Sequence, residues 1–194
     1  MMQGIERHPL EPFVPEGARL LMLGAFPPKK EKWSMEFFYP NFINDMWRIF
    51  GYILFNNKEY FVDVGHKTFH KESIIKMLSD LGIALGDTAK SVVRLKDNAS
   101  DKFLQVEEAI DIYSMIEKLP NCIAIVTTGE KAASVLASIT ASEVPKVGSY
   151  IELLFSGNRI VRHYRMPSSS RAYPMKVEKK AEYYRQMLSD LGII

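Results

Sequence analysis

The sequence lacks the cysteines that disulfides and metal clusters require. Its 194 residues include one cysteine, Cys122, so a disulfide within the chain is excluded. Cys122 lies in a strand-like apolar run, where we expect a buried and unreactive thiol. No cysteine cluster is present that could hold an iron–sulfur centre. We therefore expect no iron–sulfur cluster, and no metal is implied.

Long apolar runs are also missing. Leu20–Phe26 and Cys122–Val126 are among the longest, and both are far shorter than the roughly 20 residues that span a bilayer. The first residues, MMQGIERHPLEPF, contain no apolar core of the kind found in secretory signals. We therefore expect a cytoplasmic protein without a membrane partner.

Several common catalytic motifs cannot be found. There is no glycine pattern of a phosphate or dinucleotide loop after any strand-like segment. His66 and His70 are four residues apart but lack the glutamate of a zinc protease between them, so we expect no metal site there. Ser168–Ser170 lacks the flanking glycines of a hydrolase nucleophile elbow. A serine hydrolase built on these serines remains an alternative, and a serine-reactive phosphonate would label it.

The charge is nearly balanced, with 25 Lys and Arg against 23 Asp and Glu and a net charge of +2. This balance excludes the sequence-independent DNA binding of histone-like proteins but allows a local basic patch. Basic residues do cluster, in Lys29–Lys32 and again between Arg159 and Arg171, although a solvated surface would look the same. The length and the 47% hydrophobic content predict a single domain over residues 1–194, which we expect to be a monomer.

Apolar runs and helical periodicities alternate along the chain. Strands are predicted at Ala18–Gly24, Ile83–Thr88, Cys122–Val126, Tyr150–Phe155 and Arg159–Arg165, and helices at Asn44–Phe55, His70–Leu81, Ile110–Lys118, Gly129–Ile139 and Val177–Leu191. Ala89–Phe103 is polar and is predicted to be a long loop. The alternation predicts an α/β protein, a three-layer α/β/α sandwich with a mainly parallel central sheet.

Sheets of this kind bind ligands at the carboxyl ends of their strands. This rule selects three loops, Ala25–Pro28, Thr128–Gly129 and Met166–Ala172. The hydroxyl groups of the third loop can bond to a phosphodiester backbone, although an ordinary serine-rich turn would have the same composition. Phe37–Trp47 combines aromatic rings, which can stack on a base, with asparagines, whose amides can bond to a base edge. The alternative interpretation of Phe37–Trp47 is a hydrophobic loop that packs onto a helix.

Five short motifs occur in an order and spacing that resemble the uracil-DNA glycosylase superfamily, closest to its hypoxanthine-DNA glycosylase and mismatch-specific uracil-DNA glycosylase branches. The match extends over residues 18–191, and the motifs are Gly24–Pro28, Phe38–Tyr39, Asn44–Trp47, Thr128–Ala132 and Met166–Ser170.

The resemblance implies the fold, the activity and the site residues. It makes Asn44 the catalytic residue and Tyr39 the aromatic residue that stacks on a flipped base. The base pocket would be bounded by Tyr39 together with Gly24, Ala25, Phe26, Thr128 and Gly129. The DNA would be held by Met166, Pro167, Ser168, Ser169, Ser170 and Arg171, without a cofactor.

The chain departs from the family pattern in both loops. Ala25, Phe26 and Pro28 occupy variable places of the first loop, and Arg171 and Tyr173 replace a proline and an asparagine of the last motif. The first loop contains no carboxylate, so we expect a slow enzyme whose rate comes largely from stabilising the leaving base. Two functions stay open. One is a DNA-repair glycosylase that excises uracil or hypoxanthine, and the other is a catalytically silent member that only binds nucleic acid or a nucleotide.

Overall fold

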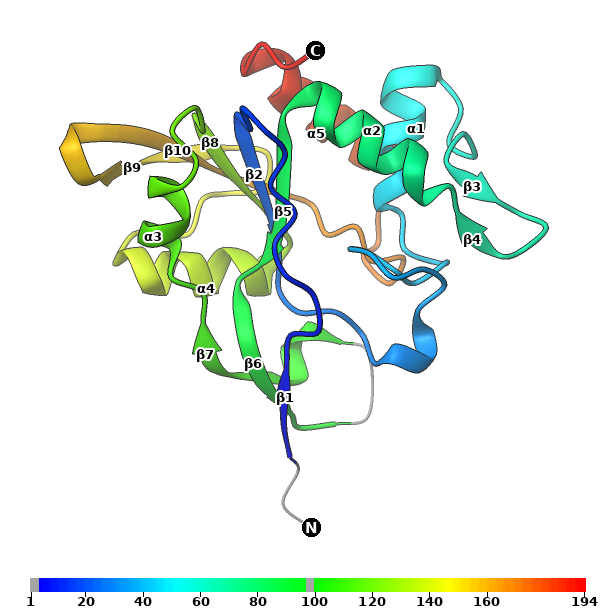
Figure 1. Cartoon of the computed structure of the whole chain (residues 1–194), viewed down its shortest axis with the longest axis horizontal. Helices are drawn as coiled ribbons and strands as arrows, with labels where there is room; N and C mark the ends of the chain where they lie inside the picture. Colours follow the sequence, from blue (N-terminus) through cyan, green and yellow to red (C-terminus); the bar gives the residue numbers. More distant parts are fainter. Residues whose placement is uncertain (1–3, 97–99) are drawn as a thin grey trace.

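The structure is a computed structural model that describes residues 4–96 and 100–194, and helices cover both faces of its central sheet (Figure 1). The strands are β1 Ile5–Arg7, β2 Leu20–Gly24, β3 Val62–Asp63, β4 Thr68–Phe69, β5 Ile83–Asp87, β6 Ala89–Arg94, β7 Leu104–Ala109, β8 Ala124–Thr128, β9 Tyr150–Phe155 and β10 Arg159–Met166. The helices are α1 Met46–Phe55, α2 Lys71–Leu81, α3 Ile112–Glu117, α4 Glu130–Thr140 and α5 Val177–Asp190, with short 3-10 turns η1 Lys30–Lys32, η2 Asp101–Phe103 and η3 Ser156–Asn158.

The central sheet has five strands in the order β5-β2-β8-β10-β9. The first four are parallel, and β9 pairs antiparallel with β10 across the turn η3. Because β2, β8 and β10 are parallel neighbours, their carboxyl ends meet at one edge of the sheet. The three loops selected from the sequence follow these strands, so the prediction that they lie at one edge is confirmed.

The continuous apolar run of β2 is explained by burial on both faces. Leu20 and Met22 belong to the core cluster that includes residues of α1, α2 and α5, whereas Leu21 and Leu23 belong to the cluster that includes residues of α3 and α4. This alternation is the period-two geometry of a strand. Figure 1 shows α1, α2 and α5 to the right of the sheet and α3 and α4 to its left. The predicted three-layer α/β/α arrangement is confirmed.

The prediction of a long loop over Ala89–Phe103 is wrong. Its first part is strand β6, which pairs antiparallel with β1 on one side and β7 on the other. Ala89 and Val92 are buried there with Phe26 and Leu104 in a small third cluster. The partner strand β1 lies more than 80 residues earlier, as the pairing of Ile5 with Val93 shows, so no local pattern could reveal it. Residues 97–99 of the expected loop lie outside the described residues.

Most other predictions differ from the structure by one or two residues at their ends. The strand expected at Cys122–Val126 is β8, which runs from Ala124 to Thr128 and therefore includes both threonines. Cys122 is buried, as predicted, and burial raises the pKa of its thiol to about 11, which disfavours the reactive thiolate. Within residues 4–96 and 100–194, we find no helix with the length and apolarity that crossing a membrane requires.

A histidine buried inside β10 makes the stability depend on pH. His163 is fully buried, with its Nε2 atom 2.9 Å from the Thr127 hydroxyl oxygen. Burial, and then the charge of Arg165, lowers its pKa to about 4. A histidine in an unfolded chain has a pKa of about 6.5. Between the folded and the unfolded pKa, this histidine is therefore protonated mainly in the unfolded chain. The folded state is therefore favoured above this window and loses stability as the pH falls through it.

We expect the free energy of unfolding to fall by up to about 3 kcal/mol between about pH 7 and pH 4 because of His163. Urea denaturation at a series of pH values measures this. The variant His163→Gln, which has no group that titrates there, should show a shallower fall. Identical pH dependence in both proteins would mean that His163 does not carry the effect.

Candidate active site

The carboxyl ends of β5, β2 and β8 bring polar groups together around one glycine. Gly24 pairs with Asp87 across β2 and β5, and Thr128 ends the strand on the other side of β2. A Cβ atom on Gly24 would lie 2.5 Å from Asp87 Oδ1 and 3.4 Å from the Tyr39 hydroxyl. Only glycine allows the carboxyl group and the phenol to approach the backbone this closely. We call Gly24, Tyr39, Asp87, Thr128 and His8 the strand-end cluster.

Asp87 is the acidic group of this cluster. Its side chain is 9% exposed, and its Oδ2 atom lies 2.6 Å from His8 Nε2. Burial raises the pKa of Asp87, while the bonds that it accepts from His8 and from the Gly24 N–H act in the opposite direction. A carboxyl group with a raised pKa is a stronger proton acceptor when ionised than an ordinary one. Asp87 can therefore serve as a base.

Tyr39 is held in an unusual conformation beside Asp87. Its φ of 50° lies in the left-handed region, which costs a non-glycine residue about 1–3 kcal/mol and persists only where contacts fix it. Its hydroxyl lies 2.9 Å from Thr128 Oγ1, and its ring meets Trp47 edge to face at 5.8 Å. Burial first, and then the Asp87 charge, raises the pKa of Tyr39, so the phenol is neutral.

Gly129 connects the strand-end cluster to the serine loop. Its φ is +120°, and a Cβ atom there would lie 3.4 Å from Ser168 Cβ. The turn after β8 and the loop after β10 are thus in direct contact. The predicted pocket residues Gly24, Tyr39, Thr128 and Gly129 are therefore linked into one site with Ser168.

The first loop offers fewer free groups to a ligand than the sequence predicted. Phe26 is 8% exposed, and its ring packs against His8 at 5.3 Å and within the cluster of β6 and β7. The carbonyl groups of Gly24 and Ala25 accept bonds from Thr88 and Ala89. This loop is consequently fixed to the turn between β5 and β6, with the Phe26 side chain directed into the protein.

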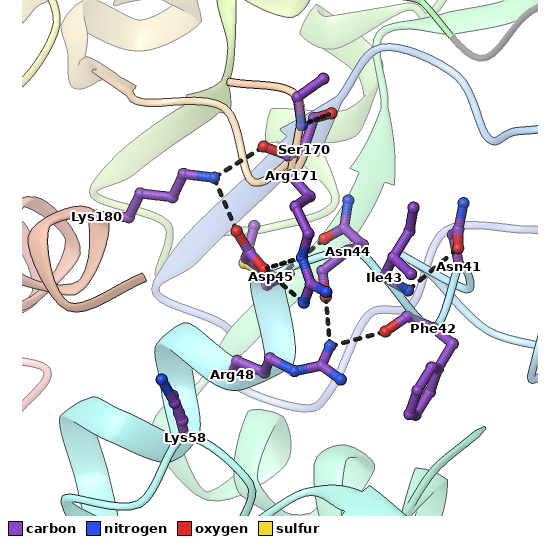
Figure 2. A network of polar contacts seen from close by, with 12 residues as sticks. Asn41, Phe42, Ile43, Asn44, Asp45, Arg48, Lys58, Ser170, Arg171 and Lys180 are labelled. Atoms are coloured by element: carbon purple, nitrogen blue, oxygen red, sulfur yellow. Dashed lines mark hydrogen bonds and ion pairs between the residues drawn. The ribbon is translucent and has the colours of Figure 1, made fainter. Parts of the chain in front are cut away.

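Asn44 lies two residues before the first residue of α1, next to the N-cap residue Asp45. Its Oδ1 atom accepts from the Met46 N–H at 2.9 Å, and its main-chain carbonyl accepts from Arg48 at 3.0 Å. Arg48 also donates to the Phe42 carbonyl at 2.7 Å and so fixes the segment before the helix (Figure 2). Because the Asn44 Oδ1 atom accepts from the Met46 N–H, the Asn44 amide nitrogen is the end that can donate to a ligand.

A buried ion cluster fixes the loop after β10. Asp45 is 3% exposed and accepts from Arg171 at 3.1 Å and from Lys180 at 2.9 Å. Lys180, which is fully buried on α5, also donates to the Ser170 carbonyl at 2.8 Å. The Asp45 N–H donates to the Ser169 carbonyl. Figure 2 shows Lys180 and Arg171 converging on Asp45 from two sides. We call Asp45, Arg171 and Lys180 the Asp45 cluster.

The six loop residues predicted to contact DNA divide into two groups. Met166, Pro167 and Ser169 are buried, and the Pro167 carbonyl accepts a bond from the Tyr184 hydroxyl. Ser168 is partly exposed, Ser170 is exposed, and the Arg171 side chain is 50% exposed. The first group supports the loop, and the second group is the part that can reach a phosphodiester.

The sequence reasoning named Arg171 but missed Asp87, His8, Asp45 and Lys180. Asp87 could have been found, because it is the next-to-last residue of the predicted strand Ile83–Thr88, whose carboxyl end lies at the same edge as the selected loops. Asp45 and Lys180 meet across 135 residues, which no local motif encodes. In the described parts of the chain, no group of three or more His, Cys, Asp and Glu residues could hold a metal ion.

Comparisons with known proteins agree with the fold. No protein-family model matches the chain, and neither does any curated protein. Among solved structures, the chain is similar to a solution NMR structure from Methanosarcina acetivorans of a protein described as a candidate uracil DNA glycosylase. The two are 21% identical with a TM-score of 0.64, over 97% of this chain and 99% of the other. The chain therefore has the fold of a uracil-DNA glycosylase, as its motifs predicted.

Proposed function

We propose that this protein is a DNA glycosylase that flips a deaminated base, uracil or hypoxanthine, out of DNA and hydrolyses its N-glycosidic bond. The observation that carries this proposal is the buried Asp87 carboxyl group, held over Gly24 and beside Tyr39 at the strand ends of a uracil-DNA glycosylase fold. The resemblance of the five sequence motifs to the hypoxanthine-DNA and mismatch-specific branches supports this choice of bases.

Hydrolysis requires a water molecule that attacks C1′ of the sugar while the base leaves with the bonding electrons. Asp87, when ionised, accepts the proton of this water. The proton acceptor missing from the first loop is thus supplied by the adjacent strand β5. The rate then depends on water activation as well as on stabilisation of the leaving base.

Asn44 donates to the leaving base. Deamination converts the amino group of cytosine or adenine into a carbonyl group, so uracil and hypoxanthine both present an acceptor where the parent base presents a donor. The amide nitrogen of Asn44, oriented by the bond that its Oδ1 atom accepts from the Met46 N–H, matches that acceptor. It also stabilises the negative charge that develops on the leaving base. One donor thus accounts for both recognition and catalysis.

The DNA backbone is held by the exposed members of the serine loop. Ser168 and Ser170 hydroxyls and the Arg171 guanidinium bond to phosphates. Arg171 can leave Asp45 for a phosphate because Lys180 continues to neutralise the Asp45 carboxylate. Tyr39 stacks on the flipped base, which recovers about 1–3 kcal/mol of the cost of unstacking.

Base release from duplexes with a single uracil or hypoxanthine, followed by alkaline cleavage at the abasic site, tests this function. After incubation with wild-type protein, these duplexes should be cleaved by the alkali, and the matching cytosine and adenine duplexes should stay intact. Asn44→Ala should lower the rate by about 100-fold or more, as expected for the loss of one donor to a developing negative charge.

Asn41→Ala is the matched control, because Asn41 lies in the same segment and its side chain accepts a bond from the Ile43 N–H. Its rate should stay close to wild type. Full activity of Asn44→Ala would contradict the role of Asn44. Salt-dependent DNA binding without any base release would instead identify the binding-only alternative.

A further inference from the structure

The N-terminal segment positions the imidazole of His8 within the strand-end cluster. Strand β1 pairs with β6, and the His8 N–H continues this pairing by donating to the Lys90 carbonyl at 2.8 Å. The His8 ring lies 5.3 Å from the Phe26 ring and 6.1 Å from the Phe38 ring, measured between centroids. Its Nδ1 atom lies 2.9 Å from the Leu10 carbonyl oxygen. The imidazole therefore has a fixed position and orientation.

The other ring nitrogen meets the proposed catalytic carboxylate. His8 Nε2 lies 2.6 Å from Asp87 Oδ2, while Asp87 Oδ1 faces Gly24. The side chains of His8 and Asp87 are 11% and 9% exposed, so water competes little for this contact. A donor at this distance fixes the rotation of the carboxyl group and favours its ionised form.

We propose that His8 is a positioning residue of the reaction, whose imidazole keeps the Asp87 carboxylate ionised and turned toward Gly24. This proposal rests on the proposed function, because it assigns Asp87 the proton of the attacking water. The N-terminal segment is then a part of the active site.

The direction of the pH effect follows from the contacts. The bond and the charge of His8 both lower the pKa of Asp87, against the effect of burial. Among the described residues, Tyr39 and Asp101 also interact with the Asp87 charge, and Arg94 and Lys131 act on Asp101. These four side chains remain when His8 is replaced. Removing the imidazole therefore raises the pKa of Asp87, and less of the carboxylate is ionised at low pH.

Single-turnover rates of base release between about pH 5.5 and pH 9 test the proposal on the full chain. His8→Phe keeps a ring between Phe26 and Phe38 but removes the donor. We expect the acid limb of its pH–rate profile to move up by about one pH unit, with a loss of about 10-fold at pH 6 and a smaller loss at pH 9. His8→Gln, which can still donate, should lie between His8→Phe and wild type.

His66→Gln is the matched control, since His66 forms an exposed pair with Asp63 at 2.8 Å on the β3–β4 turn. Its profile should equal that of wild type. A loss in His8→Phe that is equal at every pH would overturn the proposal, because it would show a purely structural role. An unchanged profile would overturn it as well.

A second measurement does not depend on activity. The 13C carboxyl resonance of Asp87, followed by NMR as the pH is changed without DNA, reports its titration directly. The midpoint should be higher in His8→Phe than in wild type, and equal midpoints would overturn the role of His8. A shifted midpoint together with no base release by wild type would reject only the proposed function.

Discussion

Asp87→Asn is expected to lower the rate of base release by at least about 100-fold, while the affinity for DNA stays within about threefold. Asparagine has nearly the same shape as aspartate, and its carbonyl oxygen can still accept the bond from the Gly24 N–H. It cannot accept a proton from water, so the chemical step is lost and the binding surface is preserved. Single-turnover release measures the first quantity, and fluorescence anisotropy with labelled duplex measures the Kd.

Asp80→Asn removes the same charge from an exposed position on α2, where Asp80 pairs with Lys76 at 2.6 Å. This control should release base at the wild-type rate. The Asp87→Asn variant should also lose the acid limb of the pH–rate profile that we assign to Asp87. If Asp87→Asn retains the wild-type rate, the carboxyl group is not the base, and the reaction needs another proton acceptor.

Asp45→Ala is expected to lower the free energy of unfolding by about 3–5 kcal/mol, the cost of removing one partner of a buried ion pair. Lys180 is fully buried and bonds to Asp45 and to the Ser170 carbonyl. Without the Asp45 carboxylate, the Lys180 ammonium group keeps the Ser170 carbonyl and the Tyr173 ring at 5.8 Å, but it loses the negative charge that neutralises it. The loop after β10 also loses the ion pair between Arg171 and Asp45. Urea denaturation measures the change.

Two further variants separate the contributions to the Asp45 cluster. Adding Lys180→Met to Asp45→Ala removes the unpaired charge and should recover a large part of the lost stability. Arg171→Ala should cost about 1 kcal/mol or less, because the Arg171 side chain is half exposed and Lys180 still pairs with Asp45. A cost below about 1 kcal/mol for Asp45→Ala would show that the cluster does not hold the loop.

The parts of the fold that depend on local patterns could be predicted from the sequence. The apolar run of β2 marks a strand buried on both faces, and Gly82 ends α2 in the left-handed conformation that glycine favours. The three strand-end loops follow from the order of the elements alone. Each of these features is determined by residues close together in the sequence.

The parts that depend on distant pairing could not be predicted. β6 is a strand because β1 and β7 pair with it, and its exposed Lys90 and partly polar composition gave the segment the appearance of a loop. Phe26 lies in the loop that the family resemblance assigned to the base, yet its ring packs onto His8 and the β6–β7 cluster. His8 reaches Asp87 only because β1 pairs with β6. The pair of His8 and Asp87 is therefore a consequence of tertiary structure.

The most direct test of the proposed chemistry is to detect the free base itself. An excess of wild-type protein is incubated with a duplex that carries one uracil, or one hypoxanthine, and the released base is quantified by chromatography with mass detection. The proposed function predicts one free base and one abasic site per cleaved duplex, and a large loss of both with Asp87→Asn. Stable binding of these duplexes without any free base would contradict it.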